Sequence, residues 1–190
     1  AIYYIVAESF PAAQNNPHLE IFRQKGIEVL LLHDRVDEWL TSHLTEVSGK
    51  KLQSVAKGDL DLSKFDDEET AEAQKQQEKD FESVIKQMKE VLGETVKEVR
   101  VTHRLTDSPS CVVADEAGMS MHLQRMMAAA GQNMPSLPPI LEVNPQHHLV
   151  ERLKEEQDDT LFSEWTQLLF EQAKLAESGQ LDDPATFVKR

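Results

Sequence analysis

Two short apolar runs near the start of the chain limit its fold more than any other feature. Ile2–Ala7 and Ile27–Leu32 have the length of strands and contain only one charged residue, as expected for strands covered on both faces. Between them, His18–Lys25 is a predicted helical segment with Asn16 as its N-cap and Gly26 as its end. Two strands joined through a helix are expected to be parallel. The sequence therefore predicts a small α/β sandwich at the amino-terminal end.

Charge divides the chain into two parts. Residues 1–57 hold 7 acidic and 6 basic residues, whereas residues 58–190 hold 27 acidic and 14 basic residues, which together give the net charge of −14. A short helix around Glu38–Leu44 lies near the end of the first part, and residues 58–70 have the composition of an acidic linker. We therefore predict one subdomain over residues 1–57 and a second domain over residues 58–190.

The second part mixes helices and strands. Apolar residues from Phe81 to Leu92 recur at helical spacing and predict a long helix that ends at Gly93. Three short apolar runs predict a three-stranded sheet: Val99–Val101, Cys111–Val113 and Ile140–Val143. Further helices are expected at about 119–130, 147–156 and 159–178, and from Pro184 onward. The predicted fold class is thus a two-part chain, an α/β sandwich followed by a mixed α+β domain.

The residue pattern gives no support for catalysis, a metal site or a cofactor. The seven glycines are scattered without a Gly-x-Gly pair, and no Cys-x-x-Cys or His-Glu-x-x-His pattern occurs. His147 and His148 are adjacent, so on a helix their side chains would point about 100° apart and share a metal poorly. The net charge argues against binding nucleic acid, and no apolar run reaches the roughly 20 residues that cross a bilayer. Cys111, the single cysteine, fits a buried side chain and a reducing, cytoplasmic compartment.

Methionine is concentrated in one segment of the second part. Five of the six methionines fall between residues 119 and 134, and Met121 projects from one side of the predicted helix. The opposite face carries a shared stripe: Met119, Leu123, Met126 and Met127. One interpretation buries this stripe in the core. The other places flexible, polarizable Met side chains on a surface that adapts to many partners.

The last two predicted helices carry more apolar side chains than a small domain can cover. In the segment 159–178 these side chains extend over more than half of the helix circumference, and Asp183-Pro184 then starts a short amphipathic helix. They either fill the domain's own core or pack against a second copy in a four-helix dimer bundle. The expected interface residues are Leu161, Trp165, Leu168, Leu169, Phe187 and Val188.

Several longer motifs occur in order along nearly the whole chain. They include Pro17-His18-Leu19-Glu20, Asp37-Glu38-Trp39, Arg104-Leu105-Thr106-Asp107-Ser108-Pro109, Glu142-Val143-Asn144-Pro145 and Phe162-Ser163-Glu164-Trp165. Together these motifs resemble the ninety-kilodalton heat-shock chaperone family, in its bacterial, high-temperature protein G type. The first two resemble the end of the family's middle domain, and the others resemble its C-terminal dimerisation domain. Because the sequence begins within a predicted strand and without methionine, we expect it to be a fragment.

The resemblance implies a cytoplasmic molecular chaperone of the heat-shock and stress response that uses ATP and Mg²⁺ in protein folding. The nucleotide domain would precede residue 1, so the segment in hand would be neither an ATPase nor a cofactor-binding unit. It would supply homodimerisation and part of the surface for unfolded clients, with other chaperones as a further class of partner. The client-binding positions that the resemblance implies are Glu38, Trp39, Ser42, Met119, Leu123, Met126 and Met127; Ser42 replaces a larger amide found in relatives.

Two other function classes remain open on the sequence alone. A stand-alone dimeric adaptor would bind amphipathic peptides through the same apolar helices without an ATP cycle. A small α/β enzyme would need polar residues gathered in a cleft, and no such constellation can be assembled from their spacing. A nucleotide domain upstream of residue 1 would separate the chaperone from the adaptor.

Overall fold

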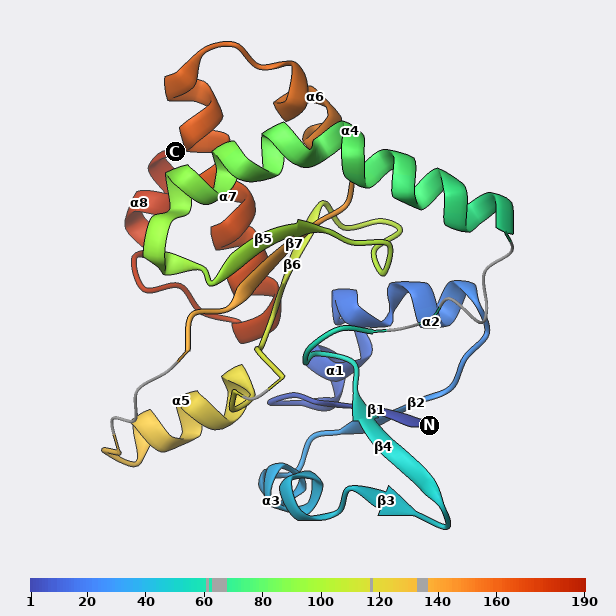
Figure 1. Ribbon diagram of the computed structural model, residues 1–190. Helices are drawn as coiled ribbons and strands as arrows, with labels where there is room; N and C mark the ends of the chain where they lie inside the picture. Colours follow the sequence, from blue (N-terminus) through green and yellow to red (C-terminus); the bar gives the residue numbers. More distant parts are fainter. Residues whose placement is uncertain (61, 63–67, 117, 133–136) are drawn as a thin grey trace.

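The computed structural model describes residues 1–60, 62, 68–116, 118–132 and 137–190 and contains two units, each built on its own sheet (Figure 1). The first unit contains β1 (Ile2–Val6), α1 (Phe10–Gln14), η1 (Pro17–Leu19), α2 (Glu20–Gln24), β2 (Val29–Leu32), α3 (Arg35–His43), β3 (Glu46–Val47) and β4 (Lys50–Ser54). The second contains α4 (Glu68–Leu92), η3 (Gly93–Thr95), β5 (Glu98–Val101), β6 (Ser110–Val113), α5 (Met121–Ala129), β7 (Ile140–Val143), α6 (His148–Glu155), α7 (Asp159–Ser178) and α8 (Pro184–Lys189). Part of the predicted linker over residues 58–70, and Met134, lie outside the described residues.

The first sheet has the strand order β2-β1-β4-β3. Strands β1 and β2 are parallel, with Tyr4 opposite Leu30, so the predicted parallel pair is confirmed. The sequence patterns missed helix α1 and the short antiparallel hairpin of β3 and β4. The prediction that the second strand is covered on both faces is wrong, because Leu30 is 51% exposed. Its neighbours Val29 and Leu31 point the other way, toward the core, as alternation along an edge strand requires.

Local signals account for the segment between β1 and β2. The Asn16 side chain accepts the N–H of His18 at 3.0 Å and so caps the short helical stretch, as predicted. Gly26 has φ +65°, a left-handed conformation that ends the stretch at low cost for a residue without Cβ. The chain then turns back, and Ile27 N–H donates to the Phe22 carbonyl at 2.8 Å. The crossover is therefore set by neighbouring residues.

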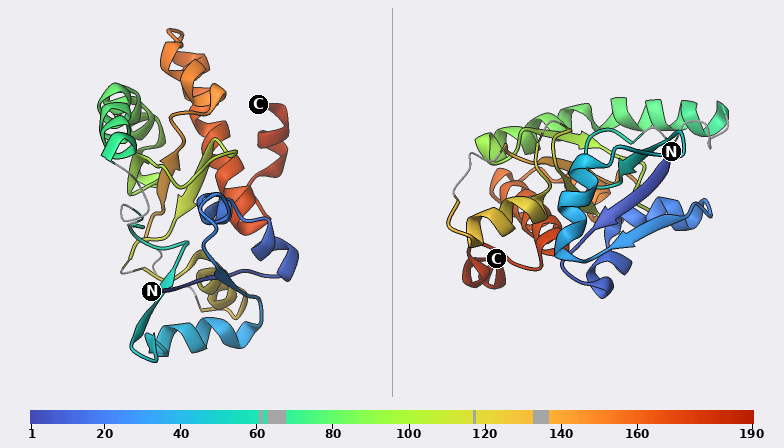
Figure 2. Two further views of the ribbon diagram at one scale, coloured as in Figure 1. Left: turned by 90° about the vertical axis from the view of Figure 1, so that its right-hand side faces the viewer. Right: turned by 90° about the horizontal axis from the view of Figure 1, so that it is seen from below.

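The second sheet has the order β5-β7-β6 and matches the predicted three strands. Strand β7 pairs parallel with β5 and antiparallel with β6. Helix α4 packs over β5 and α7 packs over β6, and the two helices contact each other. They therefore cover the same face of the sheet, which carries Val99, Leu141 and Val112. Figure 2 gives two further views of these helices and the sheet. The predicted stripe on α4 is confirmed, since Phe81, Val84 and Met88 are buried together with Leu141 and Phe170. Burial of such side chains stabilises the unit by about 1.5–3 kcal/mol each.

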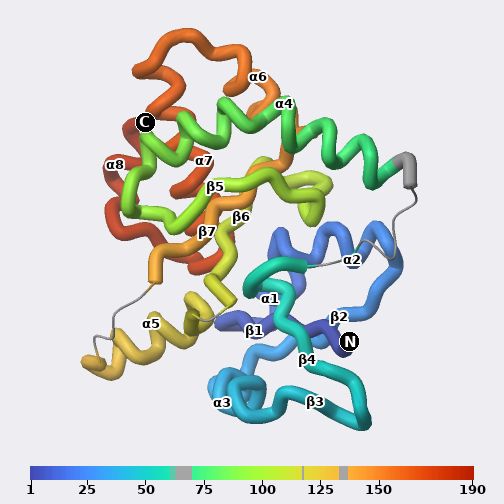
Figure 3. The backbone as a smooth tube through the Cα atoms, in the orientation of Figure 1, coloured from blue at the N-terminus to red at the C-terminus, as the bar shows by residue number. Residues whose placement is uncertain are grey.

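Hydrogen bonds join the two units along a continuous seam. Ala114, just after β6, pairs with the first unit: its N–H donates to the Ala56 carbonyl, and its carbonyl accepts the N–H of Gly58. On the other side of the seam, the Glu20 carboxylate accepts the backbone N–H groups of Thr106 at 2.7 Å and Asp107 at 2.9 Å. By contrast, α5 lies away from the sheet of its own unit and beside α3 of the first unit (Figure 3).

Candidate functional site

Helix α3 presents most of its large apolar side chains to solvent. Its N-cap is Asp34, whose backbone N–H donates to the Asp37 carboxylate at 2.8 Å as part of a capping box. Trp39 is 55% exposed, and Val36 and Leu40 are exposed as well. Large apolar side chains that gather on a surface are unusual unless the surface binds something.

Helix α5 has no buried residue. Its N-cap is Ser120, whose Oγ accepts the N–H of Leu123 at 3.0 Å. Met121 packs against the core of the second unit from one side of the helix. All four side chains of the predicted stripe are half-buried: Met119, Leu123, Met126 and Met127. Two of them, Met119 and Met127, line the same groove as Met121, so the stripe is not wholly on the opposite face. These side chains are therefore partly accessible, although none of them stands fully in solvent.

Helices α3 and α5 meet at a polar contact. Glu38 of α3 is only 5% exposed, and the hydroxyl of Ser120 donates to its Oε1 at 2.7 Å. A cavity of about 60 Å³ lies beside this contact, lined in part by Ser42, Leu123 and Glu177. A larger groove of about 480 Å³ runs between the Met side chains of α5 and the end of α7. Helix α5 thus has accessible space on two sides.

The end of α7 places a carboxylate beneath α5. Glu177 Oε2 accepts a hydrogen bond from Asn16 at 3.0 Å and lies 3.6 Å from His18 Nε2. Burial raises the pKa of Glu177 to about 7, although the hydrogen bond from Asn16 lowers it. Burial and the nearby Arg104 lower the pKa of His18 to about 3. Nε2 of His18 lies 3.1 Å from the Val112 carbonyl, and an imidazole nitrogen facing a carbonyl is the N–H donor.

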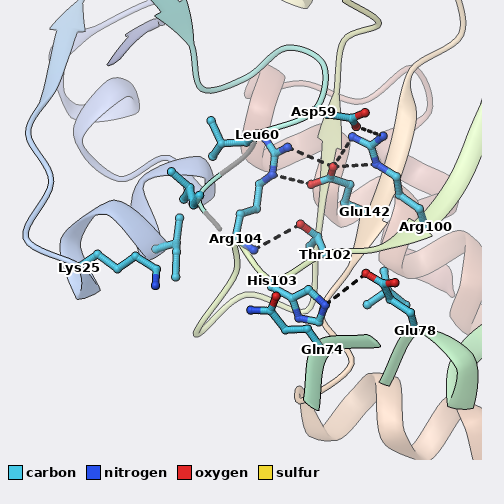
Figure 4. Close-up of a pocket in the computed structure, with 13 residues that line it drawn as sticks. Lys25, Asp59, Leu60, Gln74, Glu78, Arg100, Thr102, His103, Arg104 and Glu142 are labelled. Carbon is cyan, nitrogen blue, oxygen red and sulfur yellow. Dashed lines mark hydrogen bonds and ion pairs between the residues drawn. The ribbon is translucent and has the colours of Figure 1, made fainter. Parts of the chain in front are cut away.

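The seam contains a buried ion cluster that sequence reasoning missed (Figure 4). Arg104 Nε donates to Glu142 Oε2 at 2.7 Å, and Arg100 Nη2 donates to Glu142 Oε1 at 2.6 Å. Arg100 also pairs with Asp59, so two cations face two carboxylates. Arg104 reaches across to the first unit, since it donates to the Val55 carbonyl at 2.8 Å. The cluster lines a pocket of about 390 Å³, and the hydrogen bond from Arg104 to the Val55 carbonyl links it to the first unit.

Within the described ranges, no group of three or more His, Cys, Asp or Glu side chains is placed to hold a metal ion. In the same part of the chain, every helix is too short or too polar to cross a bilayer. The expectation that His147 and His148 diverge on a helix is wrong, because His147 is the N-cap of α6 and its ring stacks on His148 with centroids 4.6 Å apart. Cys111 is buried as predicted, and burial raises the pKa of its thiol.

Comparison with known proteins assigns the chain to a family. The family model described as Hsp90 protein matches residues 1–190. The chain belongs to the Hsp90 family. It is 57% identical to the chaperone protein HtpG of Pseudoalteromonas translucida and to that of Colwellia psychrerythraea, and 60% identical to that of Burkholderia lata, each over 189 residues and 100% of this chain. The chain spans only 30%, 29% and 29% of the length of these curated relatives.

In this Hsp90-family chain, the residues implied for client contact fall on α3, on α5 and, in the case of Met119, just before α5. The two helices are adjacent in space and distant in sequence. Trp39 and Ser42 are exposed on α3, and the Ser42 hydroxyl donates to the Trp39 carbonyl at 2.8 Å. Glu38 differs from the rest because its side chain is buried. No sequence signal predicted the burial of Glu38, because its hydrogen-bond partner Ser120 lies 82 positions away.

The residues implied for dimerisation in this Hsp90-family chain divide into three groups by their exposure. Leu161 and Val188 are exposed, the latter by 82%. Three others keep part of their surface accessible: Trp165, Leu168 and Phe187. Leu169 is only 3% exposed and packs in the chain's own core, so the prediction that it is an interface residue is wrong. The backbone carbonyl of Leu169 accepts the Ser110 hydroxyl at 2.9 Å, which places this turn of α7 directly on β6.

Proposed function

We propose that this chain is the part of an Hsp90-type chaperone that binds unfolded clients and holds two subunits together. Its relatives carry the name chaperone protein HtpG, and the matched segment is less than a third of their length. The main support for this proposal is the apolar surface of α3 and α5, which is only partly buried by the rest of the chain. Family membership and the single unpaired cysteine support a role in heat-shock and stress response in the cytoplasm.

The proposed client contacts form what is called here the α3–α5 surface: Trp39, Met119, Leu123, Met126 and Met127. Four of its five side chains are Met or Leu, which repack at little cost, and the fifth is an exposed indole with a large contact area. Such a surface suits clients that share apolar segments and no common sequence. Ser42 borders this surface without contributing apolar area.

Binding of an unfolded probe tests the α3–α5 surface. We expect the double variant Met126→Ser and Met127→Ser to bind fluorescein-labelled, reduced and carboxymethylated lysozyme at least about 5-fold more weakly, a loss of about 1 kcal/mol or more. Fluorescence anisotropy measures the affinity, and Leu137→Ser, at an exposed apolar residue outside both helices, is the matched control. A loss of more than about 2 kcal/mol of folding stability in the double variant would instead assign Met126 and Met127 to the core.

The proposed dimer is formed by α7 and α8, which together would give a four-helix bundle about a two-fold axis. Its contacts would be Leu161, Trp165, Leu168, Phe187 and Val188, with Leu169 left out because it is buried within the chain. A stable interface of this kind buries on the order of 1,200–2,000 Å² in total. Two chains of charge −14 repel each other, but at about 0.15 M salt this repulsion is screened beyond about 8 Å.

Sedimentation equilibrium at micromolar concentration tests the dimer. We expect the 190-residue chain to be a dimer that strengthens modestly as salt rises, because salt screens the repulsion between like charges. Truncation after Gly179 removes α8 and is expected to weaken the dimer severely. A monomeric intact chain, or an unchanged dimer after the truncation, would contradict the proposal.

The proposal assigns ATP binding and hydrolysis to the part of the relatives that this chain does not cover. The chain's glycines are scattered, and none lies in a phosphate-cradling Gly-rich loop. We expect phosphate release by the purified chain to equal the buffer blank. Release above the blank that disappears when a residue of this chain is substituted would contradict the assignment.

A further inference from the structure

Glu38 is a buried carboxylate on a helix that is otherwise exposed or half-buried. Burial of an ionised carboxylate is costly unless hydrogen bonds compensate for the lost water. The hydroxyl of Ser120 supplies such a bond, at 2.7 Å from Glu38 Oε1. The charge therefore faces α5 and is shielded from a large ligand in solvent. This placement does not suit a residue that touches clients directly.

The Ser120 hydroxyl takes part in two bonds at once. It accepts the N–H of Leu123 at 3.0 Å as the N-cap of α5, and it donates its only hydrogen to Glu38. The order Leu123 N–H, Ser120 Oγ–H, Glu38 Oε1 is a continuous hydrogen-bonded chain from the first turn of α5 to α3. A carboxylate near a helix N-terminus is also favoured by the helix dipole.

Helix α5 depends on such contacts because its own packing is weak. It is nine residues long and has no buried residue, and isolated helices of this length are marginal in water. Its other polar anchors come from Arg125, which donates to the Ser178 carbonyl and lies 3.9 Å from the Glu8 carboxylate. Those contacts hold the middle of α5, whereas Glu38 holds its N-terminal end.

We propose that Glu38 is a positioning residue that locks α5 to α3 through Ser120. The inference rests on the proposed client-binding function, because it explains how side chains from both units form one surface. Trp39 follows Glu38 directly on α3, and Leu123 lies in the turn that Ser120 caps. The Glu38–Ser120 contact therefore sets the spacing between the apolar groups of the two helices. Without it, each helix keeps its side chains but the two parts of the surface lose their alignment.

An uncharged probe separates positioning from direct contact. The probe is a peptide of leucine, glycine and serine with an amidated C-terminus and a neutral fluorophore on its N-terminus, which offers no charge to a carboxylate. We expect Glu38→Ala and Ser120→Ala each to weaken its binding about 5- to 10-fold, as loss of one hydrogen bond implies. The double variant should bind no more weakly than either single variant, because both changes break the same contact. Glu38→Gln keeps an acceptor oxygen for Ser120 and should restore affinity to within about 2-fold of the original.

Amide hydrogen exchange gives a second readout that is independent of any ligand. Glu38→Ala should speed exchange of the Leu123 amide while exchange in β7 stays unchanged, since only the first turn of α5 is released. Additive losses in the double variant, or an unchanged Leu123 amide in Glu38→Ala, would overturn the proposal. If the original chain does not bind the peptide, the proposed client-binding function is contradicted. The exchange experiment still decides whether Glu38 positions α5. Glu38→Gln provides a folded comparison should Glu38→Ala unfold.

Discussion

Helices α5 and α7 carry similar apolar patterns and have opposite fates in the structure. Helix α7 turns Phe162, Leu169 and Phe170 into the core against α4 and β6, whereas α5 has no buried residue. Both were open to the same two interpretations from sequence, as core or as contact surface. The difference lies in what faces each helix: a sheet and a long helix cover α7, while polar contacts hold α5 to its neighbours. The number of apolar side chains on a helix therefore sets how much apolar surface it could bury. The elements packed against the helix determine how much of that surface is buried in fact.

The largest expected difference between the two helices is the cost of shortening a leucine. Leu169→Ala should reduce the free energy of unfolding by about 2–5 kcal/mol, because it leaves a cavity in a packed core. Leu123→Ala, the matched change on α5, should cost less than about 1 kcal/mol. Urea unfolding followed by circular dichroism measures both. Equal losses would show that α5 is as firmly packed as α7.

A smaller effect is expected from pH, at the end of α7 beneath α5. Glu177 has a pKa of about 7 in the folded chain against an ordinary value of 4.5, so the folded state binds more protons between these values. Its contribution to stability is therefore fully present below about pH 4.5 and is lost as pH rises through 7. Since one pKa unit corresponds to about 1.4 kcal/mol, the loss between these two pH values is roughly 3 kcal/mol.

The variant Glu177→Gln isolates this effect, because His18 acts in the opposite direction. His18 is neutral in the folded state down to pH of about 3 and protonated in the unfolded state below 6.5, so it adds stability as pH rises to 6.5. The difference in unfolding free energy between the original chain and Glu177→Gln should decline from pH 4.5 to above 7. Glu164→Gln, at an exposed position of α7, should show no such decline. A constant difference for Glu177→Gln would contradict the assignment.

The smallest expected effect is the difference in stability cost between substitutions on two sides of α5. Met121 packs against the core of the second unit, and Met126 belongs to the α3–α5 surface. Met121→Ala should cost about 1–2 kcal/mol of stability, less than for a fully buried methionine. Met126→Ala should cost less than about 0.5 kcal/mol. The reverse order would mean that α5 is rotated about its axis relative to the structure.

Much of the secondary structure could be predicted because its signals are local. The predicted strand Ile140–Val143 and the predicted helix over 159–178 have the bounds found in the structure. Gly179, with φ +68°, ends α7, and Asp183 caps α8 by accepting the N–H of Thr186 at 3.0 Å. Periodicity, caps and glycines act between residues a few positions apart, so a single sequence displays them. Hairpin β3–β4 was missed because its residues are largely exposed and polar.

The sequence by itself determined most of the strands and helices in their order, the amount of apolar surface available and the family to which the chain belongs. Only the tertiary structure decided which apolar faces are covered and which polar residues meet. Arg104 and Glu142 lie 38 positions apart, Glu38 and Ser120 lie 82 apart, and Asn16 and Glu177 lie 161 apart. Nothing in the residues between them encodes such a contact. Each contact forms because the two sheets pack together with their helices and bring distant residues side by side. Burial then makes each hydrogen bond strong and its loss costly.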